Sequence, residues 1–148
     1  MPKTIQHSAN RRPNVLIPLL VGGILIALLV SVLYLTQNPT TADSLPAEVS
    51  VAEAAQMREA GAFVLDVRQP EEWNQFHIPG ATLIPLGELE SRLDEIPADQ
   101  PVLVVCRSGN RSATGRDILL EAGFSKVTSM AGGMNEWQAL GYSTVSGP

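Results

Sequence analysis

The sequence contains little cysteine and little positive charge. Cys106 is the one cysteine in 148 residues, so neither an intramolecular disulfide nor a cysteine-rich zinc site can stabilise the fold. The chain has 10 Lys and Arg against 15 Asp and Glu, which argues against non-specific binding to nucleic acid. No histidine pair or acidic cluster has the spacing of metal ligands, so we expect neither a metal nor another cofactor. Stability must therefore come from a packed core.

Charged residues are also missing from one long stretch, residues 13–42. Within it, residues 15–35 form an almost entirely apolar run of 21 residues, which as a helix has the length of the hydrocarbon core of a bilayer. We interpret this run as a retained transmembrane helix. A cleaved signal peptide is the main alternative, although its apolar part is usually only about 7–15 residues long; a buried core helix is the third interpretation.

The charges on either side of this segment predict its orientation. Lys3, Arg11 and Arg12 precede it, whereas residues 36–57 contain no Lys or Arg. The positive-inside rule therefore makes residues 1–14 a cytoplasmic tail and places the rest of the protein outside the cytoplasm.

Two further features bear on how the protein sits at the membrane. Seven Lys and Arg and all 15 Asp and Glu follow Leu35, so this part carries a formal charge of −8 and should not lie on anionic lipid. Gly23, Ala27 and Ser31 recur every four residues, a spacing that allows two helices to pack closely and suggests a weak homodimer through the anchor.

Residues 36–46 are polar and rich in turn formers, which predicts a linker before a domain over residues 47–148. Ser50 and Glu53 have the spacing of a capping box and predict a helix over residues 51–60. Residues 63–67 and 101–106 are short, continuous apolar runs, which are typical of parallel strands buried on both faces.

Helical periodicity separates and follows these strands. Leu86, Leu89, Leu93 and Ile96 lie on one helical stripe. A second stripe follows Cys106 and ends at Gly123. A strand over residues 127–130 and a short helix over residues 134–140 complete the pattern. Alternating strands and helices predict an α/β fold with a parallel sheet, in which ligands bind at the carboxyl ends of the strands.

Cys106 stands at such an end, and a polar, glycine-containing loop with two arginines follows it. Amide N–H groups of the loop and the start of the next helix should surround the sulfur, and Arg107 and Arg111 add positive charge. Gly109 allows a positive φ there, and Asn110 tolerates one. These features should lower the pKa of the thiol and yield a thiolate nucleophile, whereas a buried, inert cysteine would not require them.

With these motifs, the sequence resembles the rhodanese-like sulfurtransferases. Matching motifs occur in the family's order over about residues 45–145: Asp66-Val67-Arg68, Glu71-Glu72-Trp73, His77-Ile78-Pro79-Gly80-Ala81, Ile84-Pro85, Cys106-Arg107-Ser108-Gly109-Asn110-Arg111-Ser112, Gly123-Phe124, Gly132-Gly133-Met134, Trp137 and Gly141. Phe76 departs from the pattern, because the family usually has Gly at this position.

The resemblance implies a rhodanese-like parallel sheet with helices on both faces, here preceded by one transmembrane helix. It also implies a catalytic Cys106 that takes a sulfane sulfur from an anionic donor such as thiosulfate, carries it as a persulfide and passes it to cyanide or a thiol. The substrate-binding residues would be Arg107, Ser108, Gly109, Asn110, Arg111 and Ser112.

Other residues near the motifs have more ordinary interpretations. We expect Asp66 and Arg68 to brace the loop, with Asp66 either orienting Arg111 or capping its own loop. We interpret His77 as a turn anchor, and Trp73 and Trp137 as core or pocket-edge residues. Glu71 and Glu72 should form the solvated first turn of a helix.

Two other functions remain open at this stage. The domain could be a non-catalytic binding module at the membrane, although a docking domain needs no nucleophile. It could also be an anion reductase or phosphatase, but related phosphatases have a Cys-x5-Arg loop, which is larger than the Cys-x4-Arg spacing from Cys106 to Arg111.

Overall fold

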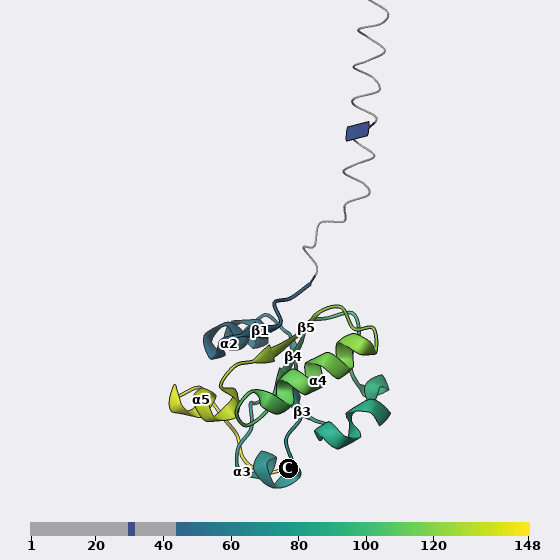
Figure 1. Ribbon diagram of the computed structural model, residues 1–148. Coiled ribbons are helices and arrows are strands. Elements are labelled where there is room, and N and C mark those ends of the chain that lie inside the picture. The colour runs from purple at the N-terminus through teal and green to yellow at the C-terminus, as the bar shows by residue number, and fades with distance from the viewer. Residues whose placement is uncertain (1–29, 32–43) are drawn as a thin grey trace, which may run out of the picture. The chain divides into compact units, whose positions relative to one another are not determined.

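Five parallel strands form the sheet at the centre of the domain (Figure 1). The computed structural model describes residues 30–31 and 44–148. In order along the sheet, the strands are β1 (Glu48–Val49), β5 (Val127–Met130), β4 (Val102–Val105), β2 (Phe63–Asp66) and β3 (Thr82–Leu83). The helices are α2 (Val51–Glu59), α3 (Pro70–Gln75), α4 (Asn110–Glu121) and α5 (Gly133–Ala139), with 3-10 helices η1 (Leu86–Ser91) and η2 (Leu93–Glu95).

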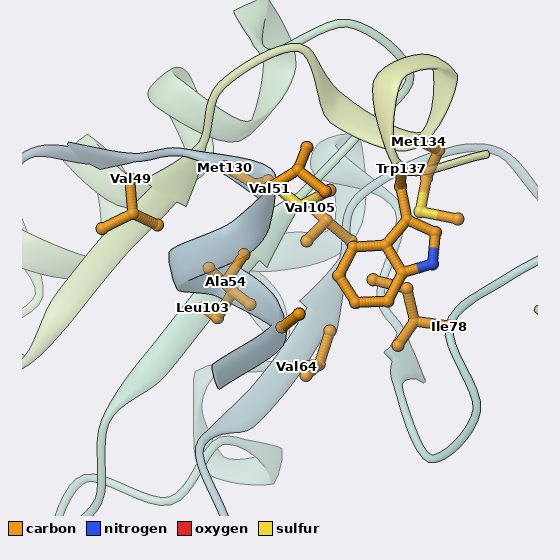
Figure 2. Close-up of a cluster of buried hydrophobic side chains, with 11 residues drawn as sticks. Val49, Val51, Ala54, Val64, Ile78, Leu103, Val105, Met130, Met134 and Trp137 are labelled. Carbon is orange, nitrogen blue, oxygen red and sulfur yellow. The ribbon is translucent and has the colours of Figure 1, made fainter. Parts of the chain in front are cut away.

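Helices cover both faces of the sheet, as the apolar strand sequences predicted. In β4, Leu103 and Val105 face a core that includes residues of α2 and α5, with Trp137 packed among them (Figure 2). Val102 and Val104 face a second core, to which α4, η1 and η2 contribute. Successive residues of β4 are thus buried on opposite faces of the sheet. Because both faces are covered, the whole strand has to be apolar.

Helix α2 begins as the capping box predicted. Ser50 Oγ accepts a hydrogen bond from the Glu53 amide at 3.3 Å, and Glu53 Oε2 accepts one from the Ser50 amide at 2.8 Å. These two bonds satisfy backbone donors that have no partner within the helix. The helix ends one residue before the predicted boundary, with Ala60 as its C-cap and Gly61 at φ +90° after it.

The stripe from Leu86 to Ile96 forms two short 3-10 helices instead of one α-helix. Backbone amides here bond three residues back, as from Arg92 to Leu89 O at 3.1 Å, and this tighter winding suits short connections. Leu89 and Ile96 are buried as expected, while Leu86 and Leu93 pack half-buried against the same core.

The sequence did not predict the two edge strands. Strands β1 and β3 have two residues each and each pairs with one neighbour. Periodicity cannot reveal elements this short, because an alternating pattern needs about four residues to be visible.

The predicted transmembrane helix over residues 15–35 falls outside the described residues except for Val30 and Ser31. Most of the predicted linker, up to residue 43, and the tail over residues 1–14 fall outside them as well. No helix in the described part of the chain is long and apolar enough to span a membrane.

Candidate active site at the Cys106 loop

Cys106 follows the last residue of β4, a strand that lies between β5 and β2. Its loop ends where α4 begins, so the cysteine lies at the carboxyl edge of the sheet, close to a helix N-terminus, as the sequence predicted. The residue is 1% exposed. A reagent therefore has to reach the sulfur through the loop that surrounds it.

The backbone of the loop turns at Gly109, which is the N-cap of α4 and has φ +104°. A side chain is strained at such an angle, so glycine is needed here. This confirms the expected positive φ at Gly109. Asn110 does not share it, since it is the first residue of α4 and no residue other than glycine has a positive φ in the described chain.

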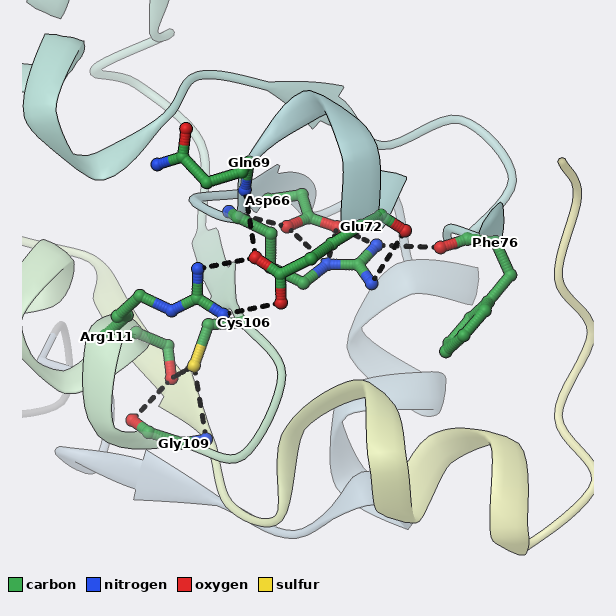
Figure 3. A network of polar contacts seen from close by, with 9 residues as sticks. Asp66, Gln69, Glu72, Phe76, Cys106, Gly109 and Arg111 are labelled. Atoms are coloured by element: carbon green, nitrogen blue, oxygen red, sulfur yellow. Dashed lines mark hydrogen bonds and ion pairs between the residues drawn. The ribbon is translucent and has the colours of Figure 1, made fainter. Parts of the chain in front are cut away.

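The loop and the first turn of α4 each provide one group that bonds to the sulfur directly (Figure 3). The Gly109 amide donates to Cys106 Sγ at 3.2 Å. Ser112 Oγ lies 3.6 Å from Sγ and 2.7 Å from Gly109 O. The serine hydroxyl has a single proton, so it can bond to the Gly109 carbonyl while the thiol is neutral and turn to the sulfur when the thiol ionises.

The pKa of Cys106 lies below its ordinary value. Burial raises this pKa, because it disfavours the charged form. The Ser112 hydroxyl and the backbone amides of Ser108, Gly109 and Ser112 lower it by a larger total amount. The thiolate predicted from the sequence is therefore stabilised mainly by hydrogen bonds from the loop and from the first turn of α4.

Helix α5 holds the outer side of the loop. The Met134 amide donates to Cys106 O at 2.8 Å, and the Asn135 amide donates to Arg107 O at 3.0 Å. Helix α5 thus anchors the backbone of the first two residues of the loop. A Cβ at Gly133 would lie only 2.6 Å from Arg107 C and Ser108 N, so only glycine permits this close approach.

Arg111 extends to α3 and pairs with Glu72. Its Nη1 and Nη2 donate to the two carboxylate oxygens, each at 2.7 Å (Figure 3). Arg111 thus joins the Cys106 loop to α3, through a partner that the sequence did not indicate. Glu72 forms part of the first turn of α3, yet it is half-buried and not simply solvated. The Arg111 guanidinium lowers the pKa of Glu72 to about 2, so the pair stays charged at neutral pH.

Asp66 pairs with Arg68 and makes no hydrogen bond to Arg111 in the described structure. Both carboxylate oxygens accept from Arg68 Nε at 2.9 Å, and both side chains are buried. Asp66 Oδ1 also accepts from the Arg68 amide at 3.0 Å, so it caps its own loop, which was the second of the two expected roles. Arg68 Nη2 donates to Phe76 O at 2.8 Å. The pair thus braces residues 66–76, the segment that carries Glu72.

Phe76, the departure from the family pattern, fits this segment without strain. Its φ is −167°, an extended angle that any residue adopts. Its ring centroid lies 5.4 Å from Arg68 Cζ, within the range of a cation–π contact.

The predicted substrate-binding residues divide by their exposure. Arg107, Ser108 and Asn110 are exposed at the rim of the loop, Arg111 is half-buried, and Gly109 and Ser112 are buried beside the sulfur. Arg107 forms no ion pair with the described residues. Its charge is therefore available to an anion arriving from solvent.

The aromatic residues and His77 have structural roles, as the sequence suggested. The His77 ring stacks on Trp73 at 3.6 Å between centroids, and its Nδ1 lies 3.1 Å from Trp73 O. The His77 backbone also pairs with Val145. Trp137 is buried in the core to which α2 contributes.

Among the described residues, no three His, Cys, Asp or Glu side chains are grouped so that they could hold a metal ion.

Comparisons with known proteins match this part of the chain. The family model of the rhodanese-like domain matches residues 50–140. The thiosulfate sulfurtransferase GlpE of Pseudomonas entomophila is 35% identical over 91 residues, which cover 62% of this chain and 84% of that protein. The putative sulfur carrier protein YrkF of Bacillus subtilis is 40% identical over 74 residues, half of this chain but only 40% of the relative.

A solved structure shows the same fold. The crystal structure of a rhodanese-related protein from Thermoplasma volcanium has a TM-score of 0.63 and 30% sequence identity to this chain. The similarity covers 68% of this chain and 98% of that one. The α/β fold with a parallel sheet is therefore shared with this relative over nearly its whole length.

Proposed function

Since the chain belongs to the rhodanese-like domain family, we propose that it is a sulfurtransferase in which Cys106 carries the transferred sulfur. The hydrogen-bonded sulfur at the end of β4 is the observation that supports this proposal most directly. A relative named thiosulfate sulfurtransferase, similar over most of its length, supports thiosulfate as a donor.

In the first step, the Cys106 thiolate attacks the outer sulfur of thiosulfate. A bond forms between Sγ and that sulfur, while the bond to the sulfite group breaks and sulfite leaves with its electron pair. The negative charge then lies on the outer sulfur of a Cys106 persulfide. Amide donors aimed at such a charge are usually a large part of catalysis. The Gly109 amide donates to Cys106 Sγ, the atom to which the outer sulfur would be bonded, at 3.2 Å.

In the second step, an acceptor removes the outer sulfur. Cyanide attacks that sulfur with its electron pair, the S–S bond of the persulfide breaks, and the thiolate of Cys106 is restored as thiocyanate leaves. A thiolate acceptor reacts in the same way and becomes a persulfide itself. No metal or redox cofactor enters this balance.

The near burial of Cys106 favours donors with a slender terminal sulfur. Only 1% of the residue is exposed, so the oxygens of thiosulfate would remain outside while its sulfur enters the loop. Arg107 is exposed at the rim, where its charge can attract the oxygens. Arg107 would therefore affect donor binding more than the chemical step.

The proposal is tested by measuring thiocyanate formed from thiosulfate and cyanide. We expect turnover by the parent protein and a loss of at least about a thousandfold in Cys106→Ser, because a serine hydroxyl does not ionise at neutral pH. Mass spectrometry should find one extra sulfur atom on the peptide containing Cys106 after incubation with thiosulfate.

Two results would contradict this function. A folded parent without turnover or persulfide would favour a non-catalytic binding module. Turnover of phosphate esters that depends on Cys106 would favour a phosphatase instead.

We also propose that residues 15–35 anchor the domain to a membrane and that the domain lies outside the cytoplasm. The support is the uncharged run and the lack of Lys and Arg in residues 36–57. Protease added to intact cells, with the outer membrane permeabilised where there is one, should cleave the domain from the membrane fraction. A domain that stays protected, or is recovered without the membrane, would contradict the proposal.

A further inference from the structure

Glu72 holds Arg111 in a way that affects which anions the loop can bind. Both terminal nitrogens of Arg111 are bonded to the carboxylate at 2.7 Å (Figure 3). Glu72 Oε2 also accepts a hydrogen bond from the Gln69 amide at 3.2 Å. The carboxylate thus has donors from two directions, and the end of the guanidinium is occupied by a group of the protein itself.

This end of an arginine is the part that recognises two oxygens of a phosphate or sulfate at once. When Glu72 occupies it, the pair has no net charge, so an entering oxyanion finds neither the paired donors nor the positive charge. Arg68, the arginine of residues 66–76, is neutralised in the same way by Asp66. Arg107 at the rim has no ion pair within the described structure.

We infer that Glu72 determines the anion specificity of the Cys106 loop: by occupying Arg111, it prevents the loop from binding tetrahedral oxyanions such as phosphate and sulfate. A sulfur atom, which needs only the amide donors, is still admitted. The inference rests on the proposed function for its biological meaning, because excluding oxyanions would keep Cys106 free for sulfur donors.

The test measures phosphate binding directly and needs no turnover. Inorganic phosphate is titrated into the full-length protein at constant ionic strength, and the NMR shifts of the backbone amides of residues 106–112 report its affinity. We expect weak binding by the parent and about tenfold tighter binding by Glu72→Gln, since freeing one charged hydrogen-bonding group is worth about that factor.

Glu71→Gln is the matched control. Glu71 lies in the same turn of α3, is exposed and has no ion pair with a described residue. The substitution removes the same charge as Glu72→Gln does, but it leaves Arg111 paired with Glu72. It should therefore change phosphate affinity by less than about twofold. Equal tightening in both variants would overturn the inference, because it would show a general effect of charge.

A double variant shows whether Arg111 is the group that is freed. In Glu72→Gln/Arg111→Met, the gain in phosphate affinity should disappear, and affinity should return to within about twofold of the parent. A gain that persists would overturn the inference. So would affinity about tenfold below that of the parent, because Arg111 would then already bind phosphate in the presence of Glu72.

The double variant also covers the case in which Glu72→Gln alone does not fold, since it removes both charges together. The thiosulfate assay of the parent remains a separate test. Turnover without any effect of Glu72 on phosphate binding would refute this inference alone, and an effect on phosphate binding without turnover would refute the proposed function alone.

Discussion

Two arginine–carboxylate pairs lie near the carboxyl edge of the sheet, and they differ in burial and in span. Asp66 and Arg68 are two residues apart, and their side chains are 0% and 2% exposed. Glu72 and Arg111 are 39 residues apart in the sequence, and their side chains are 26% and 31% exposed. The first pair braces one segment internally, whereas the second joins that segment to the Cys106 loop.

Burial determines what each pair contributes. Removing one partner of a buried pair leaves a charge without water or a counter-ion, which costs much more than the pair itself contributes. Water can solvate the remaining partner of a half-buried pair, so the cost to stability is small. Asp66 should therefore matter most to folding, and Glu72 to the properties of the loop.

The largest expected effect is on stability in Asp66→Ala. Arg68 would keep its charge in a buried site, with only the Phe76 and Glu72 carbonyls as acceptors. The free energy of unfolding, measured with denaturant, should fall by about 3–5 kcal/mol.

The double variant Asp66→Leu/Arg68→Met is the control for this prediction. It removes both charges and should recover most of the loss, because apolar residues can replace a buried pair at little cost. If Asp66→Ala were as stable as the parent, this buried pair would not differ from the half-buried pair of Glu72 and Arg111.

A smaller effect is expected on the thiol in Ser112→Ala. Burial raises the pKa of Cys106, and the hydrogen bond of the Ser112 side chain lowers it more than any other single group. Without the hydroxyl, the pKa should rise by about one unit, which corresponds to one hydrogen bond to a charged group. Ultraviolet absorbance of the thiolate during a pH titration measures the change.

Thr114→Ala is the matched control for the titration. This hydroxyl also lies on α4, but it is exposed and bonds to Asn110 O at 3.4 Å. Removal of this hydroxyl should leave the pKa of Cys106 unchanged. If both variants titrate as the parent does, the backbone amides and not Ser112 keep the pKa low.

The two pairs also show how far the sequence alone could predict this site. The capping box at Ser50 and the apolar run over residues 101–106 act over a few residues, so they predicted α2 and β4 to within one residue at each end. Cys106 and Gly109 were identified for the same reason, because the chemistry of their loop is contained in adjacent residues.

Contacts between distant segments could not be predicted in this way. Asp66 is the last residue of β2 and Glu72 lies six residues further on, and nothing local indicates which of these two acidic residues meets Arg111. The choice depends on how α3 packs beside the loop, which brings Glu72 to within 2.7 Å of Arg111. The close approach of Gly133 to the Arg107 backbone likewise depends on two segments folding together.

The smallest expected effect is the dependence on pH of the contribution from Glu72. Its pKa is lowered to about 2 in the folded protein, chiefly by the hydrogen bonds from Arg111, whereas an unfolded Glu titrates near 4.3. The folded state thus favours the charged form. Its stabilisation is complete above about pH 5, and it is lost as the pH falls towards 2.

This dependence is measured as the difference in the free energy of unfolding between the parent and Glu72→Gln. Because the pair is half-buried, the difference should be only about 1 kcal/mol at neutral pH. It should stay constant down to about pH 5 and shrink between about pH 4 and 2. The same difference for Glu71→Gln should stay near zero throughout. A difference for Glu72→Gln of about 3 kcal/mol or more would equal the effect expected for the buried Asp66–Arg68 pair. The two pairs would then contribute alike to stability, and the contrast between them would no longer hold.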